Sequence, residues 1–243
     1  MAGPTAAEQL LKDGDPQAAI KQLQAQIRAQ PADAKLRVFL FQLLCVQGDW
    51  TRALNQLTVA CELDISTLPM VQTYRETIQC ERLREGRGET ADAANLRQQA
   101  YEQAPTTRGE AKGDGEPLKF EWIADADMRI GPVLEAVVNG KYYWVPWNRL
   151  SKVSIEAPTD LRDRVWMPST LMFSNGGEQV AFLPTRYAGT DLSDPLLALA
   201  RKTDWHEPQP GLFVGSGQRM LATDVGDLAL MDLRMITLDD GSD

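Results

Sequence analysis

The sequence predicts a protein of two domains, an α-helical repeat domain followed by a mixed α+β domain. Three observations support this fold class. A pattern of glycine, alanine and leucine returns in the first half, and a glycine-rich segment, 106–117, follows it. Beyond that segment the helical spacing of apolar residues gives way to short apolar runs typical of strands. A chain of 243 residues is long enough for two domains of ordinary size.

The first half repeats itself after 34 residues, the distance from Gly14-Asp15 to Gly48-Asp49. Further pairs keep the same phase: Leu10 and Leu44, Ala19 and Ala53, Ile20 and Leu54, Leu23 and Leu57. This period is typical of tetratricopeptide repeats, in which a small residue lets two helices cross closely. A third copy begins at Gly88, after an insertion around 65–69. We expect helices near 5–12, 16–30, 34–46, 50–62, 70–86 and 90–103.

Stacked repeats leave a concave groove that is lined by the first helix of each pair. Grooves of this kind hold helices or extended peptides. The residues that repeat position assigns to the groove are Lys35, Val38, Phe39, Gln42, Arg75, Ile78 and Arg82. For Val38, Phe39 and Ile78 burial in the core is an equally good interpretation, because apolar stripes on short helices lie close together. The three basic side chains favour an acidic or amphipathic peptide.

The domain boundaries expected from composition are 1–107 for the repeats, 108–118 for a mobile linker and 119–243 for the second domain. Strands are expected at 141–146, 153–157, 161–167, 180–184, 221–222 and 228–233. Asn175-Gly176-Gly177 predicts a hairpin between 165–173 and 180–183. Short helices are expected at 132–138, ending at Asn139-Gly140, and at 194–202. Together these elements predict an α+β domain with a small, partly open β-barrel, whose strand order the sequence does not give.

Charge and cysteine content exclude several classes of protein. The net charge is −9, with 11 basic and 13 acidic residues in 1–107 and 14 and 21 in 108–243. An acidic surface without a run of Lys or Arg disfavours nucleic acid as a partner. The odd set Cys45, Cys61 and Cys80 cannot form a closed disulfide framework. We find no signal peptide or membrane span and expect a cytoplasmic protein without membrane contact.

The sequence offers little support for catalysis, and we predict no enzyme, catalytic residue, metal or cofactor. The only histidine is His206, which excludes a two-histidine metal site, and Ser216 lacks a Gly-x-Ser-x-Gly context. Asp125 and Asp127, with Glu135 nearby, could hold a hard cation or form an acid/base pair. Arg129 is close enough in sequence to neutralise these acids. We therefore favour a salt-bridged structural turn at this position.

Aromatic residues cluster in the same region, at Trp122, Tyr142, Tyr143, Trp144 and Trp147. Alternation along a strand places Tyr142 and Trp144 on one face and Tyr143 on the other. Most of these rings are expected in the core, and an exposed one would mark an interface. The candidate surface of the second domain consists of Trp122, Asp125, Asp127, Arg129 and Tyr143.

Several long, distinctive sequence stretches are similar to those of one protein family. They are FEWIADAD (120–127), GPVLEAVVNGKYYWVPW (131–147), DLRDRVWMP (160–168), NGGE (175–178), PTRY (184–187), ARKTDW (200–205) and GQRMLATD (217–224). In these stretches the chain resembles the ImpE family, whose members are also called SciE-type or TagJ proteins and are accessory components of bacterial type VI secretion.

The resemblance implies a cytoplasmic adaptor that binds the N-terminal helix of the small subunit of the contractile sheath. It also implies an indirect link to the unfoldase that recycles the sheath. The family provides no catalytic motif to transfer. Two alternatives remain open: a carboxylate-based or metal-dependent enzyme centred on Asp125, Asp127 and Arg129, and a tetratricopeptide scaffold for a different partner.

Overall fold

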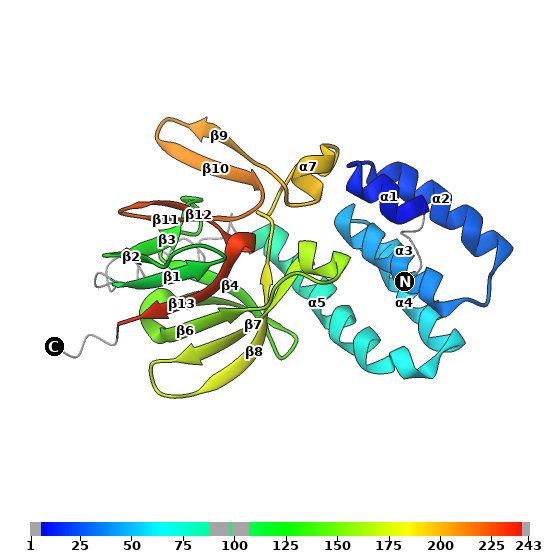
Figure 1. The fold of residues 1–243 in the computed structure, drawn as a ribbon, viewed down its shortest axis with the longest axis horizontal. Helices are drawn as coiled ribbons and strands as arrows, with labels where there is room; N and C mark the ends of the chain where they lie inside the picture. The colour runs from blue at the N-terminus through cyan, green and yellow to red at the C-terminus, as the bar shows by residue number, and fades with distance from the viewer. Residues whose placement is uncertain (1–5, 88–97, 99–106, 240–243) are drawn as a thin grey trace.

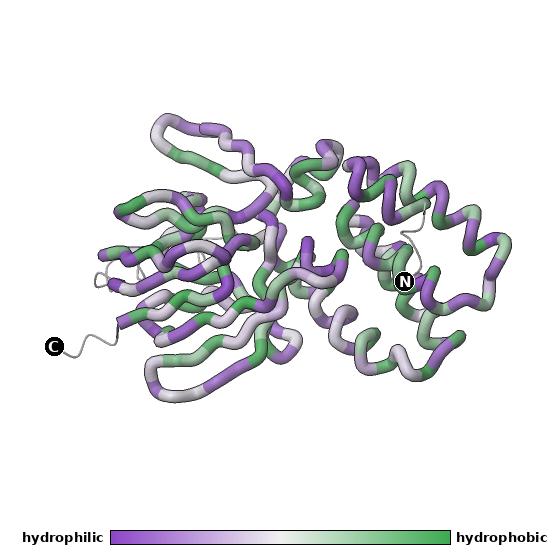
Figure 2. The backbone as a smooth tube through the Cα atoms, viewed as in Figure 1, coloured by the Kyte–Doolittle hydropathy of each residue, from purple (hydrophilic) through white to green (hydrophobic). Residues whose placement is uncertain are grey.

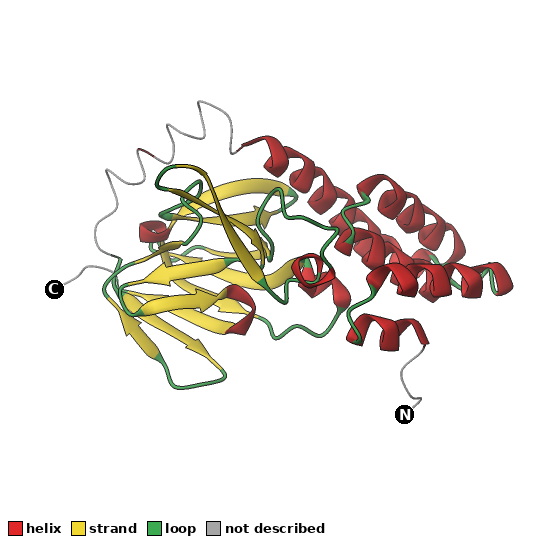
Figure 3. Ribbon diagram, turned by 90° about the horizontal axis from the view of Figure 1, so that it is seen from above, coloured by secondary structure: helices red, strands yellow, loops and turns green. Residues whose placement is uncertain are grey.

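The computed structural model describes residues 6–87, 98 and 107–239. Its helices gather at one end of the molecule and its strands at the other (Figures 1 and 3). The helical end consists of α1 (Ala6–Lys12), α2 (Pro16–Ala29), α3 (Ala34–Val46), α4 (Trp50–Leu63), the 3-10 turn η1 (Ile65–Thr67) and α5 (Leu68–Arg87). These bounds agree closely with the predicted helices, and η1 falls in the predicted insertion. Apart from residue 98, the expected helix 90–103 and the third repeat lie outside the described residues.

The repeated Gly-Asp pairs end one helix and begin the next. Gly14 and Gly48 have φ angles of 84° and 67°, a left-handed conformation that favours glycine. The following aspartates accept hydrogen bonds from the backbone at the start of α2 and α4: Asp15 from Ala18 N at 2.8 Å, and Asp49 from Arg52 N at 3.1 Å. The pairs α1–α2 and α3–α4 are therefore connected in the same way.

Helix α3 lies at the centre of the helical half. Its residues Leu40 to Val46 are all buried, which a helix in contact on one face alone would not show. It packs against α2 and α4 through small and branched side chains, including Ala19, Ala53 and Leu57, which are fully buried. The tube coloured by hydropathy shows the apolar residues recurring along α3 (Figure 2).

Eight strands of the second half form one antiparallel sheet with the order β2-β1-β13-β6-β7-β8-β4-β5. The strands are β1 (Gly109–Gly113), β2 (Leu118–Phe120), β4 (Val133–Val138), β5 (Lys141–Pro146), β6 (Leu150–Ile155), β7 (Trp166–Phe173), β8 (Glu178–Pro184) and β13 (Leu233–Leu238). Phe120 of β2 and Val145 of β5, from opposite ends of this order, belong to one hydrophobic cluster, so the sheet curves around a common core. Its two end strands do not pair with each other, so the described strands form an open curved sheet and no closed barrel.

Smaller elements complete this half. Strands β3 (Ile123–Asp125), β11 (Met220–Thr223) and β12 (Gly226–Ala229) form a three-stranded sheet, and β9 (Thr203–Gln209) pairs with β10 (Leu212–Gly217) as a hairpin. Helix α7 (Pro195–Ala198) is shorter than the expected helix 194–202. The 3-10 turns are η2 (Trp147–Arg149), η3 (Leu161–Arg164) and η4 (Leu230–Asp232).

Several predictions for the second half are wrong. The expected strand 161–167 is the turn η3 as far as Arg164, and the middle of the expected strand 228–233 is the turn η4. The segment 132–138 was expected to be a helix and is strand β4, whose six residues are all buried. Its valines fit a strand covered on both faces, and Asn139-Gly140, with φ angles of 48° and 71°, forms the hairpin turn to β5. The expected linker 108–118 contains β1, which pairs with β2 and β13 and buries Ala111. By contrast, the predicted hairpin at Asn175-Gly176-Gly177 is present as β7–β8.

The two halves share a continuous hydrophobic cluster. Trp166 of β7 and Ala198 of α7 pack with Phe41 and Tyr74 of the helical half. The indole of Trp166 also donates a hydrogen bond to Glu81 of α5 at 2.9 Å. The helices and the sheet are thus held in a fixed relation by buried side chains.

Candidate functional site

A large hollow in the described surface lies between the helices and one loop of the second half. Its volume is about 920 Å³. Side chains from α1, α2 and α3 line it, together with Asp64 and Thr67 after α4 and Thr159, Asp160 and Leu161 before and in η3. We call this hollow the α3 groove. Four of the seven predicted groove residues line it: Lys35, Val38, Phe39 and Gln42.

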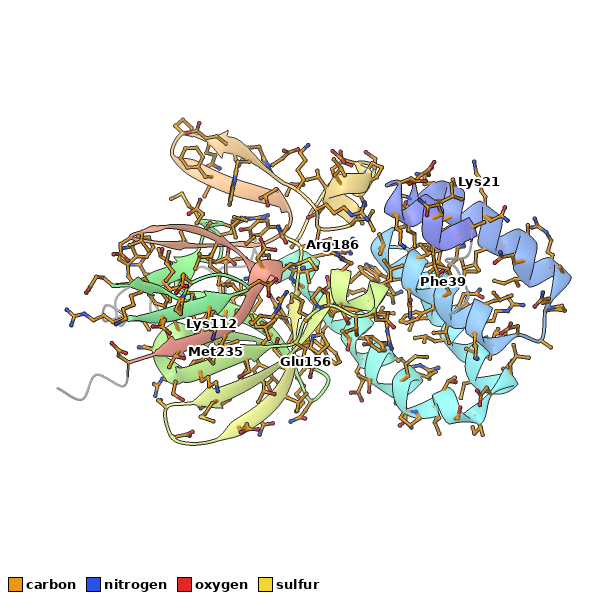
Figure 4. The ribbon with its side chains drawn as sticks, viewed as in Figure 1. Lys21, Phe39, Lys112, Glu156, Arg186 and Met235 are labelled. Atoms are coloured by element: carbon orange, nitrogen blue, oxygen red, sulfur yellow. The ribbon has the colours of Figure 1, made fainter. Side chains whose placement is uncertain are left out.

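Helix α3 presents these four residues on one face because they are three or four positions apart. Lys35 is exposed, whereas Val38 and Phe39, the latter labelled in Figure 4, are half-buried and leave part of their apolar surface open. Leu11 of α1 and Leu36 extend the apolar floor. The α3 groove therefore offers an apolar floor with a lysine at its rim.

The second half contributes one wall of the α3 groove. Gln42 donates a hydrogen bond to Asp160 at 3.2 Å, and Asp160 also pairs with Arg162 at 2.8 Å. Leu161 completes the apolar lining. Sequence analysis missed 159–161 because these residues are more than a hundred positions from α3 and meet it only in the folded chain. The only feature of 159–161 that stands out in the local sequence is the acidic side chain of Asp160. It caps η3 by accepting a hydrogen bond from Arg162 N.

The other three predicted groove residues do not line the α3 groove. Ile78 is fully buried. Arg75 and Arg82 point toward α4, where they donate to Thr58 at 3.4 Å and Thr51 at 3.3 Å. The side of α5 that carries Tyr74 is covered by the second half: Tyr74 contacts Trp166 with ring centroids 5.7 Å apart, and the guanidinium of Arg162 lies 4.9 Å from the centre of the Tyr74 ring.

The predicted acidic pair lies in a buried region at the junction of the two halves. Asp125 of β3 pairs with Arg219, which also contacts Glu135 of β4 at 2.8 Å. Glu135 in turn accepts from Arg84 of α5 at 2.9 Å. We call Arg84, Asp125, Glu135 and Arg219 the buried ionic cluster. Its charges balance, and each of its carboxylates is held by at least one arginine.

Asp127 and Arg129 form a separate pair beside this cluster. The carboxylate of Asp127 is fully buried and contacts Arg129 at 2.6 Å. It also accepts from the backbone N of Gly215 at 3.0 Å and so ties β10 to the turn after β3. The structure contains the salt-bridged turn favoured from sequence, but Arg129 pairs only with Asp127. Asp125 and Glu135, which it was also expected to neutralise, pair with Arg219 and Arg84 instead.

Burial and arginine contacts shift the pKa values in the buried ionic cluster in different directions. Burial raises the pKa of Glu135, but Arg84 and Arg219 outweigh it, and the pKa falls from 4.5 to about 2. Burial also raises the pKa of Asp125, here to about 6, against the opposing effect of Arg219. Both carboxylates are therefore charged at neutral pH.

Replacing Glu135 with glutamine is expected to destabilise the protein most at neutral pH and least in acid. The folded pKa of about 2 lies below the ordinary 4.5, so the charged form contributes stability above pH 4.5 that is lost as the pH falls toward 2. The contribution is about 3 kcal/mol at neutral pH. Urea unfolding of both proteins at several pH values measures it. If the difference in free energy of unfolding between the two proteins stays constant with pH, the lowered pKa of Glu135 is contradicted.

A further buried arginine joins the halves through backbone carbonyls. Arg186, which lies between the strands and the helices in Figure 4, donates to Val46 O at 2.6 Å and Ala198 O at 2.7 Å. These carbonyls are at the ends of α3 and α7, where a cation offsets the partial negative charge of the helix terminus. Burial lowers the pKa of Arg186 to about 10, so it stays charged.

The candidate surface of the second domain divides into exposed and buried members. Trp122 and Tyr143 are exposed, at 40% and 44%, whereas Asp125 and Asp127 are buried. Tyr142 is buried and accepts a hydrogen bond from the half-buried Trp144 at 2.6 Å, so the predicted alternation along β5 is correct.

Within residues 6–87 and 107–239, no three His, Cys, Asp or Glu side chains are grouped as metal ligands.

Comparison with known proteins gives a consistent result. The family model described as "ImpE protein" matches residues 118–237. The chain is 47% identical to "Type VI secretion system accessory component TagJ" of Pseudomonas aeruginosa, over 94% of this chain and 89% of that protein. The crystal structure of protein VPA1032 from Vibrio parahaemolyticus has the same fold, with a TM-score of 0.83 at 23% identity, covering 97% of this chain and 98% of the other. Within the described part of the chain, no helix is long and apolar enough to span a membrane.

Proposed function

Because the chain belongs to the ImpE family, we propose that it is a type VI secretion accessory protein that works as a non-enzymatic adaptor in the cytoplasm. Its α3 groove holds the N-terminal helix of the small sheath subunit. The relative that supports this role is named as an accessory component of that secretion system. The match to that relative covers 94% of this chain.

The observation that carries the proposal is the composition of the α3 groove. Val38, Phe39 and Leu161 give it an apolar floor, and a partner helix can bury its apolar face there. Lys12 and Lys35 stand at the rim with Glu8, Asp64 and Asp160. Charges of both signs at a rim favour one orientation of a bound helix over others.

An adaptor of this kind changes the availability of the sheath helix. While the helix lies in the α3 groove, it is withheld from other binders, and the accessory protein so affects how the recycling unfoldase handles the sheath. The carboxylates proposed for an alternative enzymatic role are each held by arginines in the buried region.

Replacing Phe39 with alanine is expected to weaken binding of a synthetic peptide of the sheath helix by about thirtyfold or more, because aromatic anchors dominate such interfaces. Isothermal titration calorimetry on the full chain measures the change, with micromolar or tighter binding expected for the unchanged protein. Val180→Ala is the matched control, since Val180 is 70% exposed on β8, outside the α3 groove.

A thermal melt of each variant separates loss of binding from loss of folding, since Phe39 also packs against the helical core. Equal affinity for the Phe39 and Val180 variants, or no binding by the unchanged protein, contradicts the proposed role of the α3 groove.

A further inference from the structure

Helices α4 and α5 form a second surface that the α3 groove does not include. Arg75 and Arg82 of α5 are both exposed and donate to Thr58 and Thr51 of the antiparallel α4. Both the arginines and the threonines are seven residues apart, two helical turns, which separates the two guanidinium groups by about 10 Å along the helix. The arginines therefore form a short basic stripe along the seam between α4 and α5.

The positive charge of this stripe is available to a partner. Neither Arg75 nor Arg82 forms an ion pair with a carboxylate among the described residues, and their hydrogen bonds to threonine are long. The neighbouring Arg52 differs, because it pairs with Asp49 at 3.0 Å. On a chain of net charge −9, two such guanidinium groups in line provide a local positive charge that attracts acidic groups.

An apolar pocket continues the stripe beyond Arg75. Its volume is about 400 Å³, and Cys61, Ile65, Leu68 and Val71 supply its apolar lining. Ile65 is 73% exposed, although it is a large aliphatic residue. Arg75 also borders the pocket, so a positive charge and an apolar cavity adjoin, with Glu62 as the acidic residue of the lining. An exposed apolar pocket beside charges is typical of a site that receives an anchoring side chain.

We propose that the seam between α4 and α5 is a second docking site, which binds an acidic amphipathic helix of a partner protein. Two acidic residues seven positions apart on that helix would match the spacing of Arg75 and Arg82, because residues i and i+7 lie on the same face two turns apart. A leucine, methionine or phenylalanine beyond the acid at Arg75 enters the apolar pocket. This site goes beyond the proposed sheath contact and does not depend on it.

The test uses a displayed library of random helical peptides of about 15 residues, a length at which isolated helices begin to form. The library is selected on the full chain and, in parallel, on an Arg75→Glu/Arg82→Glu variant. We expect the selected peptides to carry acids seven positions apart next to a large apolar residue. Fluorescence anisotropy should show about tenfold or greater weakening on the double variant and weaker binding at high salt.

Lys35→Glu is the matched control, because it reverses a charge of the α3 groove and leaves the seam unchanged. The selected peptides should bind this control as they bind the unchanged chain. Peptides in which both acids are replaced by lysine should prefer the Arg75→Glu/Arg82→Glu variant. Absence of enrichment, enriched peptides without paired acids, or equal binding to the double variant overturns the proposal.

Discussion

Replacing Arg219 with methionine is expected to lower the free energy of unfolding by about 3–5 kcal/mol, the cost of leaving a buried charge without its partner. The side chain of Arg219 is fully buried and contacts both Asp125 and Glu135. Methionine fills part of the space but cannot donate to either carboxylate. Urea unfolding at neutral pH, followed by circular dichroism, measures the loss.

Arg52→Met is the control for the loss of an arginine in an ion pair. Arg52 is half-exposed and pairs with Asp49 on the surface, where such a pair contributes at most about 1 kcal/mol. If the buried ionic cluster stabilises the fold, the Arg219 variant must lose several times more free energy of unfolding than the Arg52 variant. Similar losses would mean that water or rearrangement compensates the buried carboxylates.

Replacing Trp166 with alanine is expected to cost a similar amount, about 3–5 kcal/mol, through loss of buried apolar contact and the cavity it leaves. Trp166 is fully buried between the halves. Its ring centroid lies 5.8 Å from that of Trp50 and 5.7 Å from that of Tyr74. The change also leaves the buried Glu81 without the indole donor. Denaturant unfolding gives the magnitude.

The same substitution at Trp122 is the matched control, because that side chain is 40% exposed. Trp122→Ala should cost well under half as much as Trp166→Ala. If the two variants are equally stable, then the helices and the sheet are held together mainly by contacts other than Trp166. In that case the hydrogen bonds from Arg186 to the carbonyls of Val46 and Ala198 would be the principal connection between the two halves.

The helical half was largely predictable from sequence, because its signals are local. The Gly-Asp pairs at 14–15 and 48–49 mark a helix end and a cap through φ angles and short-range hydrogen bonds that follow from those residue types. The β7–β8 hairpin was predictable for the same reason. The strand at 132–138 was not predictable, because its apolar run contains no polar residue except Glu135. The period of a hydrophobic pattern does not by itself distinguish a buried strand from a buried helix.

The candidate site was only partly predictable, because its composition depends on tertiary packing. Repeat position grouped Lys35, Val38, Phe39 and Gln42, and all four line the α3 groove. It could not foresee that Trp166 and Arg162 cover Tyr74 of α5, that Ile78 is buried, or that Arg75 and Arg82 lie at the seam with α4. Nor could it pair Asp125 with Arg219, which lies 94 positions away.

The central claim, that the α3 groove holds the sheath helix, is tested most directly by hydrogen–deuterium exchange of the full chain with and without that helix as a peptide. We predict slower exchange in α3 over 34–46 and in the loop and turn over 157–164, with the seam residues 72–82 unchanged. Unchanged exchange in both α3 and 157–164 at saturating peptide would contradict the claim.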